Sequence, residues 1–285
     1  MKMRLISCLL LLWTSLADAA QARNIESTKI EDEAPHPIDG MRIINGNNAL
    51  PGQFPHQMSL RTPEGSHFCG GSIISRRWIV TSARCVVGIA LSEIQVVSGT
   101  ISLASGGTIH QVTEIVVHED YNPSVSFAYD YAVLRVSPSF TFSPYVNDIK
   151  IGSDYTLFGL PIGDGIASGL LCYASGWGIT DLDNDALPTI LQQTVLLALT
   201  DGQCKPKIPG YVDDAHVCTL TPPSNVCSGD FGGPLTCWKD DEWKLYGIAS
   251  FAFRNCNPEL PAGWADTAST KGRKWIRRAC NYCFP

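Results

Sequence analysis

The sequence has few charged residues and no excess of positive ones. Of its 285 residues 17% are charged, and 27 acidic side chains outnumber 21 basic ones, which gives a net charge of -6. Nucleic acids favour basic surfaces, so this balance argues against a nucleic-acid binder. The one basic cluster, TKGRKWIRRAC (270–280), is typical of a terminal helix whose apolar side chains face the core. A polyanion site there is the less favoured interpretation.

Long hydrophobic runs are also absent beyond the first residues. The chain opens MKMRLISCLLLLWTSLADAA, with a basic start, an apolar run and then Ala17, Asp18 and Ala19 as a small-residue cleavage site. The apolar run is shorter than the roughly 20 residues that a membrane-spanning helix needs. We therefore predict a signal peptide over residues 1–19, no membrane span, and a secreted, extracellular protein.

Free thiols and clustered metal ligands are not expected either. The sequence has 11 cysteines, and loss of Cys8 with the signal peptide leaves an even set for an oxidising compartment, where disulfides persist. The cysteines lie too far apart for a zinc site, except Cys280 and Cys283, a lone CxxC. These two form either a terminal disulfide or parts of two longer bridges, and a redox site is the least favoured reading. No metal and no cofactor is predicted.

The sequence does contain many short β-rich segments. Residues 20–42 are polar, acidic in the middle and poor in large apolar residues, which is typical of an unstructured pro-segment. From residue 43 onward, runs such as WIVTS, IQVVSG and YAVLRV alternate with turn residues, and a helix is indicated only near the C-terminus. This spacing predicts an all-β sandwich or barrel.

A glycine-rich stretch, CSGDFGGPLTC (227–237), carries a family resemblance. Gly229, Gly232 and Gly233 free the backbone around Phe231, as in a loop built to expose one side chain. The stretch resembles the nucleophile loop of the chymotrypsin-like (trypsin-type) serine proteases, which reads Cys-x-Gly-Asp-Ser-Gly-Gly-Pro. Phe231 stands where that loop has its serine. Other motifs follow in the order of the family: RIING, HFCGG, WIVTSARC, YDYAVL and CYASGWG.

The resemblance extends from Ile43 to about Arg278 and implies a fold. We expect two packed six-stranded antiparallel β-barrels, a cleft between them and a short C-terminal helix, so that residues 43–285 form an inactive protease domain. The family pattern also implies four disulfides, and it leaves Cys280–Cys283 as a pair by exclusion. The four are Cys69–Cys85, Cys172–Cys237, Cys204–Cys218 and Cys227–Cys256.

The family's catalytic triad is degenerate here. Arg84 stands at the position of the histidine base and Phe231 at that of the nucleophile, whereas Asp130 keeps the orienting carboxylate. A guanidinium only donates, and a benzyl group has no lone pair or acid proton, so neither side chain can carry a proton transfer. The resemblance assigns the oxyanion hole to the backbone N–H groups of Gly229 and Phe231.

The carboxylate of Asp130 should need a new partner. A buried carboxylate without one is costly, so we expect a salt bridge between Arg84 and Asp130. In the alternative arrangement Arg84 points to solvent, and water and Ser250 satisfy Asp130.

The parts of the family's zymogen switch are retained. Cleavage after Arg42 would make Ile43 a new N-terminus, whose ammonium in the family pairs with the aspartate of the nucleophile loop, here Asp230. His67 stands where the family helps to hold this aspartate before cleavage. In one interpretation cleavage still switches a partner-binding surface, and in the other the parts are inherited without use.

The specificity pocket departs from the family pattern. The resemblance places Asn225 at its floor, Gly263 at its far side, and Ser250 and Ala252 in the wall SFAF (250–253). No acidic residue lies at the floor to bind a basic side chain. Either the pocket is partly plugged by its own aromatic residues, or an exposed Phe251–Phe253 patch anchors a partner.

These features favour a non-catalytic serine protease homologue that binds extracellular proteins, such as active proteases, inhibitors or receptors. It would act as a modulator, cofactor or decoy in an extracellular proteolytic system. Two alternatives remain open, namely a trypsin-like endopeptidase with residual or altered hydrolase activity, and a transport or matrix role unrelated to proteolysis.

Overall fold

The structure of the chain is a computed structural model, and it describes Ile43 and residues 46–153, 156–157, 160–161, 170–180, 186–253 and 256–285. The predicted signal peptide, pro-segment and Arg42 lie outside these residues. The helices are α1 (Asp201–Cys204) and α2 (Thr270–Ala279). The strands are β1 (Asn47–Asn48), β2 (Gln57–Arg61), β3 (His67–Ser75), β4 (Trp78–Thr81), β5 (Gln95–Ser98), β6 (Thr108–Val117), β7 (Ala132–Ser137), β8 (Lys150–Ile151), β9 (Thr156–Leu157), β10 (Leu160–Pro161), β11 (Leu171–Gly176), β12 (Gln192–Leu197), β13 (His216–Thr219), β14 (Pro234–Lys239), β15 (Glu242–Ala252) and β16 (Ala262–Asp266).

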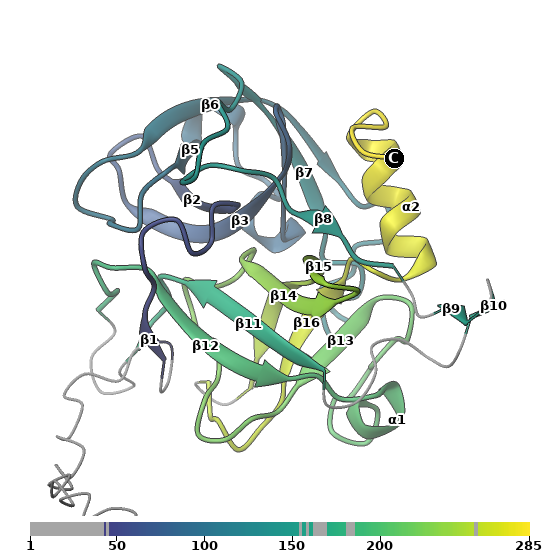
Figure 1. Cartoon of the computed structure of the whole chain (residues 1–285). Helices are drawn as coiled ribbons and strands as arrows, with labels where there is room; N and C mark the ends of the chain where they lie inside the picture. The colour runs from purple at the N-terminus through teal and green to yellow at the C-terminus, as the bar shows by residue number, and fades with distance from the viewer. Residues whose placement is uncertain are drawn as a thin grey trace, which may run out of the picture. The chain divides into compact units, whose positions relative to one another are not determined.

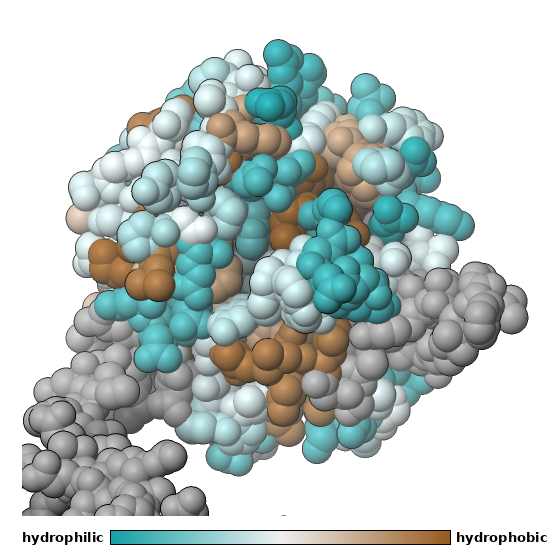
Figure 2. Space-filling model, in the orientation of Figure 1, coloured by the Kyte–Doolittle hydropathy of each residue, from teal (hydrophilic) through white to brown (hydrophobic). Residues whose placement is uncertain are grey.

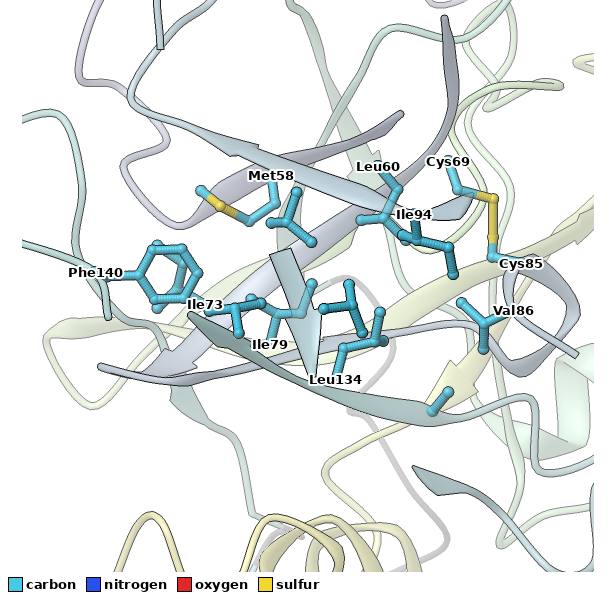
Figure 3. Close-up of a cluster of buried hydrophobic side chains, with 14 residues drawn as sticks. Met58, Leu60, Cys69, Ile73, Ile79, Cys85, Val86, Ile94, Leu134 and Phe140 are labelled. Carbon is cyan, nitrogen blue, oxygen red and sulfur yellow. A yellow bond between two sulfur atoms is a disulfide. The ribbon is translucent and has the colours of Figure 1, made fainter. Parts of the chain in front are cut away.

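The first barrel closes with six antiparallel strands in the order β2, β3, β4, β7, β6 and β5 (Figure 1). Apolar side chains fill it because the strands turn alternate residues inward. Met58, Leu60, Ile73 and Leu134 are among these buried residues, and the Cys69–Cys85 disulfide lies at the margin of the cluster (Figure 3).

The second barrel also has six main strands, in the order β12, β11, β14, β15, β16 and β13. An antiparallel bridge between Ala198 and Thr219 joins the end of β12 to the end of β13 and so closes the ring. β1 adds to β12, and β8 pairs with β15 in parallel. The expected pair of six-stranded barrels is therefore confirmed, with two short strands added to the second.

One buried cluster contains residues of both barrels and of the C-terminal helix. Val80 and Val133 come from the first barrel, Ile248 from the second, and Trp275 and Ile276 from α2. The hydroxyl of the residue before α2, Ser269, accepts a hydrogen bond from a backbone N–H of the first helical turn, as an N-cap does. In the described part of the chain, neither helix has the length and apolar character that crossing a bilayer requires.

Five disulfides connect the described residues. They join the same cysteine pairs that the resemblance and the exclusion argument give: Cys69–Cys85, Cys172–Cys237, Cys204–Cys218, Cys227–Cys256 and Cys280–Cys283. One of them fixes the turn that carries Arg84, and another holds the loop that carries Phe231.

Candidate functional site

Three chain segments bring Arg84, Asp130 and Phe231 together. Arg84 lies on the short 3-10 turn Ala83–Cys85 that follows β4, Asp130 precedes β7, and Phe231 lies in the turn before β14. The backbone N–H of Arg84 donates to Oδ1 of Asp130 at 2.8 Å. The side chain of Arg84 in turn reaches the ring of Phe231. The three expected site residues are thus neighbours.

Asp130 is fully buried, and its hydrogen bonds come from Ser250 and the backbone. The Ser250 hydroxyl donates to Oδ2 at 2.6 Å, and the N–H of Arg84 occupies Oδ1. Burial raises the pKa of Asp130 to about 6, although these hydrogen bonds and the charge of Arg84 act in the opposite direction. Among the described residues, the carboxyl group is therefore satisfied without an imidazole and without an ion pair.

The expected salt bridge between Arg84 and Asp130 is wrong. No ion pair within 4.0 Å joins the two side chains in the described residues; the guanidinium instead donates through Nη1 to the carbonyl oxygen of Ser250 at 2.5 Å. Its central carbon lies 4.3 Å from the centre of the Phe231 ring and 4.4 Å from that of the Phe127 ring. A delocalised, weakly hydrated guanidinium stacks well on aromatic faces, and Asp130 already has other donors.

Phe127 is a site residue that the sequence analysis did not identify. It lies three positions before Asp130, in a turn where Ser126, Phe127 and Tyr129 all have positive φ, an uncommon conformation for residues with a side chain. The Phe127 ring also stacks at 6.1 Å on that of Phe251. The sequence signal was the aromatic residue itself, close to the aspartate, but no pattern indicated the turn that aims it at Arg84.

The loop around Phe231 requires its glycines. Gly232 has φ +82°, and a Cβ there would lie 2.2 Å from Oγ1 of Thr81 and 2.4 Å from the carbonyl oxygen of Gly70. The N–H of Gly70 donates to the carbonyl oxygen of Phe231 at 2.8 Å. The N–H groups of Gly229 and Phe231, expected as an oxyanion hole, have no acceptor within the described ranges. Within these ranges they could donate to a carbonyl or anionic ligand.

Asp230 is buried in the same loop without a positive partner among the described residues. Its Oδ1 accepts from the N–H of Gly178 at 2.8 Å and its Oδ2 from the N–H of Cys227 at 2.9 Å. Burial raises the pKa of Asp230 to about 7, and the two hydrogen bonds offset only part of this effect.

Ile43 and His67, the other described parts of the switch, do not contact this carboxylate through a polar group. Ile43 is fully buried, and its carbonyl oxygen accepts from the N–H of Gly46. His67 donates from Nε2 to the carbonyl oxygen of Gly229 at 3.0 Å, and the Ser59 hydroxyl donates to its Nδ1 at 2.8 Å. His67 therefore holds the loop through the residue next to Asp230.

The residues expected around a specificity pocket are satisfied by one another. The side-chain amide of Asn225 donates to the carbonyl oxygens of Asn257 and Leu260, and its oxygen accepts from the N–H of Val226. Ala252 is half-buried and pairs with Ala262 across β15 and β16. The floor of the pocket is therefore a neutral amide whose N–H donors and oxygen already make hydrogen bonds within the chain.

Phe251 and Gly263 pack against each other on the neighbouring strands. A Cβ on Gly263 would lie 2.1 Å from the tip of the Phe251 ring. Phe251 is buried and Phe253 half-buried, with their ring centres 5.5 Å apart. An exposed Phe251–Phe253 patch is therefore wrong, because the Phe251 ring is enclosed by Gly263, His216 and Phe127.

The site as a whole can bind and orient groups through donors and aromatic faces. Within the described ranges, no set of three or more His, Cys, Asp or Glu side chains is arranged to hold a metal ion. His67, His110 and His216 make hydrogen bonds with Ser59, Ser98 and the carbonyl oxygen of Ser126 respectively, and His67 also donates to the carbonyl oxygen of Gly229. The group beside Phe231 is a guanidinium, which donates and does not accept.

Comparison with known proteins agrees with the fold and the order of the motifs. A family model described as Trypsin matches residues 43–276. Trypsin alpha of Drosophila melanogaster is 31% identical over 247 residues, which cover 86% of this chain and 89% of that protein. Trypsin beta of Drosophila erecta is 31% identical over 242 residues, covering 84% and 88% respectively. With two β-barrels, five disulfides and a match over most of its length, this chain belongs to the trypsin family of serine proteases.

Proposed function

We propose that this chain is a secreted, non-catalytic member of the trypsin family that works by binding other extracellular proteins. Its partners would be active proteases, protease inhibitors or receptors, and its role that of a modulator, cofactor or decoy in an extracellular proteolytic system. The disulfides favour an oxidising location, and the first 19 residues have the composition of a signal peptide.

The observation that carries this proposal is the contact between Arg84 and Phe231. Acyl transfer in this family needs a nucleophile and a base that accepts its proton. At these two positions the chain has a benzyl ring and a guanidinium whose carbon lies 4.3 Å from that ring. Neither group can be the nucleophile or the base. Arg84 stands where the family has the base and Phe231 where it has the nucleophile, so the two positions that would exchange a proton are both occupied by groups that cannot. Loss of one such group already costs on the order of a million-fold in turnover.

What remains of the site supports binding. The N–H groups of Gly229 and Phe231 are without acceptors in the described residues, and Asp230 lies buried at the position that the family couples to cleavage. A trypsin-type cut after Arg42 would supply the charge that Asp230 lacks. A ligand that prefers one of the two states would then shift the population between them.

The alternative function is a trypsin-like endopeptidase with residual activity. The N–H groups of Gly229 and Phe231, which have no acceptor among the described residues, favour it, because an oxyanion hole together with substrate binding retains about 10³ to 10⁴ of rate enhancement over water in related enzymes. This is far below the rate of an enzyme with a complete triad.

A fluorophosphonate probe, which reacts with activated serine nucleophiles, tests the loss of catalysis. We expect no labelling of the chain before or after cleavage at Arg42, and labelling of the R84H/F231S double variant under the same conditions. Labelling of a cleft residue in the unaltered chain would contradict the proposal.

Binding is tested separately on immobilised cleaved chain, uncleaved chain and a D230N variant. Each is challenged with purified trypsin-type proteases and with their protein inhibitors. We expect retention of one of these classes by the cleaved chain. Failure of all three chains to retain either class would leave a matrix or transport role as the better account.

A further inference from the structure

The outer face of the second barrel carries large apolar side chains where strands usually have polar ones. On β11, Cys172 and Ala174 point into the barrel core, so Leu171 and Tyr173 point outward. On β12 Thr194 and Leu196 are buried, and the alternate residues Val195 and Leu197 point outward.

The strand register aligns these side chains with two tryptophans. Leu171 pairs with Leu197 on one side. On the other side Cys172 pairs with Cys237, and this register sets Leu171 opposite Trp238. Trp238 in turn pairs with Trp243 on β15. One row of apolar side chains therefore crosses four strands. We call this the β11–β15 patch; its members are Leu171, Tyr173, Val195, Leu197, Trp238 and Trp243.

The members of the patch are exposed and in contact with one another. Five of them expose between 36% and 47% of their surface, and Tyr173 is half-buried. The ring centres of Trp238 and Trp243 are 5.3 Å apart, and those of Tyr173 and Trp243 are 5.2 Å apart. Figure 2 shows hydrophobic residues gathered over β11 and β12, below the hydrophilic turn between β14 and β15.

The first barrel offers a comparison on the same molecule. The outward positions of β6 and β7 include Gln111, Glu114 and Arg135, with an ion pair between Arg135 and Glu114. This is the usual alternation for a barrel face in water. The β11–β15 patch departs from it over four adjacent strands, and exposed contiguous apolar surface of this kind marks an interaction site.

The charges beside the patch indicate its occupant. Lys150 and Lys244 lie next to Glu242 at 2.6 and 3.1 Å, and Lys244 lies 3.2 Å from Asp240. With Lys239 and Asp241 of the same hairpin, three cations and three carboxylates make a rim without net charge. Such a rim suits a two-fold related copy, which presents the same groups in reverse order. An anionic lipid surface would instead need an excess of basic residues.

We propose that the β11–β15 patch is a homodimer interface that binds the same patch of a second copy of this chain. Tryptophans are the side chains that most often dominate such interfaces, and here two of them lie in contact in the patch. The inner faces of the same strands form the core of the second barrel, whereas Phe231 packs against the first-barrel cluster. The dimer therefore leaves Arg84 and Phe231 outside the interface, and the inference does not depend on the proposed loss of catalysis.

The test is sedimentation velocity of the full chain from a secretory host, over an about hundredfold concentration range, because dimerisation follows mass action. We expect a monomer–dimer equilibrium for the unaltered chain. W238K should raise the dimer dissociation constant at least about 30-fold, as loss of a dominant interface residue does. L171K, on the neighbouring strand, should weaken the dimer too.

The matched control is I109K, which places the same charge at an exposed apolar strand position of the first barrel. It should dimerise like the unaltered chain, and circular dichroism should show all three variants folded. If W238K does not fold, L171K decides the matter alone. A monomeric unaltered chain throughout the range would overturn the inference, as would a W238K or L171K dimer of unaltered strength. A monomer that binds phosphatidylcholine vesicles would reassign the patch to lipid and equally overturn it.

Discussion

The guanidinium of Arg84 lies over two aromatic rings, and the nearer of them, whose centre is 4.3 Å from the guanidinium carbon, belongs to Phe231. The two residues stand at the positions of base and nucleophile in the trypsin family. A hydroxyl and an imidazole there would make a polar pair, whereas a benzyl ring and a guanidinium make a cation–π pair. The two replacements are therefore compatible as a pair, because the Phe231 ring offers the guanidinium an aromatic face that a serine would not offer.

Truncation of Arg84 to alanine should lower the free energy of unfolding by about 1.5–3.5 kcal/mol. At this half-buried side chain the two cation–π contacts contribute roughly 0.5–1 kcal/mol each, and the hydrogen bond to the carbonyl oxygen of Ser250 about 0.5–1.5 kcal/mol. Urea unfolding measures the change. In double-mutant cycles R84A should couple to F127A and to F231A.

The matched control is R76A, which removes a cation–π contact to Phe142 from the exposed Arg76 and should cost under about 0.5 kcal/mol. Coupling of R84A to D130N but to neither ring would restore the salt-bridge interpretation.

The fold followed from the sequence more directly than the site did. The apolar segment WIVT becomes strand β4 because both of its faces are buried, Ile79 in the first-barrel cluster and Trp78 and Val80 in the cluster shared with α2. The cysteine pairs follow from matched landmarks along the chain. The position of Phe127 did not follow, since it depends on a turn with positive φ at Ser126, Phe127 and Tyr129. The salt bridge failed for a related reason. A pairing of Asp130 with the nearest charge takes no account of the Ser250 hydroxyl and the backbone N–H of Arg84, which each donate to one of its carboxylate oxygens.

Catalysis should return only when both degenerate positions are reverted. Asp130 keeps its donors and the N–H groups of Gly229 and Phe231 lack acceptors in the described residues, so R84H/F231S would reassemble a triad on a formed scaffold. We expect ester hydrolysis by the cleaved double variant at least about tenfold above either single reversion, because these groups act as a unit. R84H and F231S alone should match the unaltered chain, and F127A added to the double variant should raise the rate by clearing space beside His at position 84. Equal activity in a single and the double variant would show that another residue supplies the missing group.

Phe251 should make Gly263 intolerant of any side chain. A Cβ at Gly263 would lie 2.1 Å from the Phe251 ring, so G263A should destabilise the fold by roughly 1–3 kcal/mol, as overpacking does. The F251A/G263A double variant should lose less than the two single losses added together, because the added methyl group then fits the space of the ring. The matched control is G202A, whose Cβ would have 3.9 Å to its nearest neighbour. Thermal unfolding provides the measurement. A G263A variant as stable as G202A would mean that the ring moves aside and the pocket opens.

Asp230 should make the uncleaved chain less stable as the pH rises from about 4 to 7. Burial raises the pKa of this carboxyl to about 7, above the roughly 3.9 of an aspartate in the unfolded chain. The folded state therefore binds the proton more strongly, and the stability gained from this is complete below about pH 4 and lost as the pH rises through 7.

In melting curves of the uncleaved chain, D230N should flatten this pH dependence, and D148N, at an exposed aspartate, should leave it unchanged. Cleavage after Arg42 should also flatten this pH dependence, because an Ile43 ammonium that pairs with Asp230 lowers the pKa of the Asp230 carboxyl. Parallel melting profiles for the uncleaved chain, the cleaved chain and D230N would mean that Asp230 titrates alike in the folded and unfolded states, and the switch would lose its physical basis.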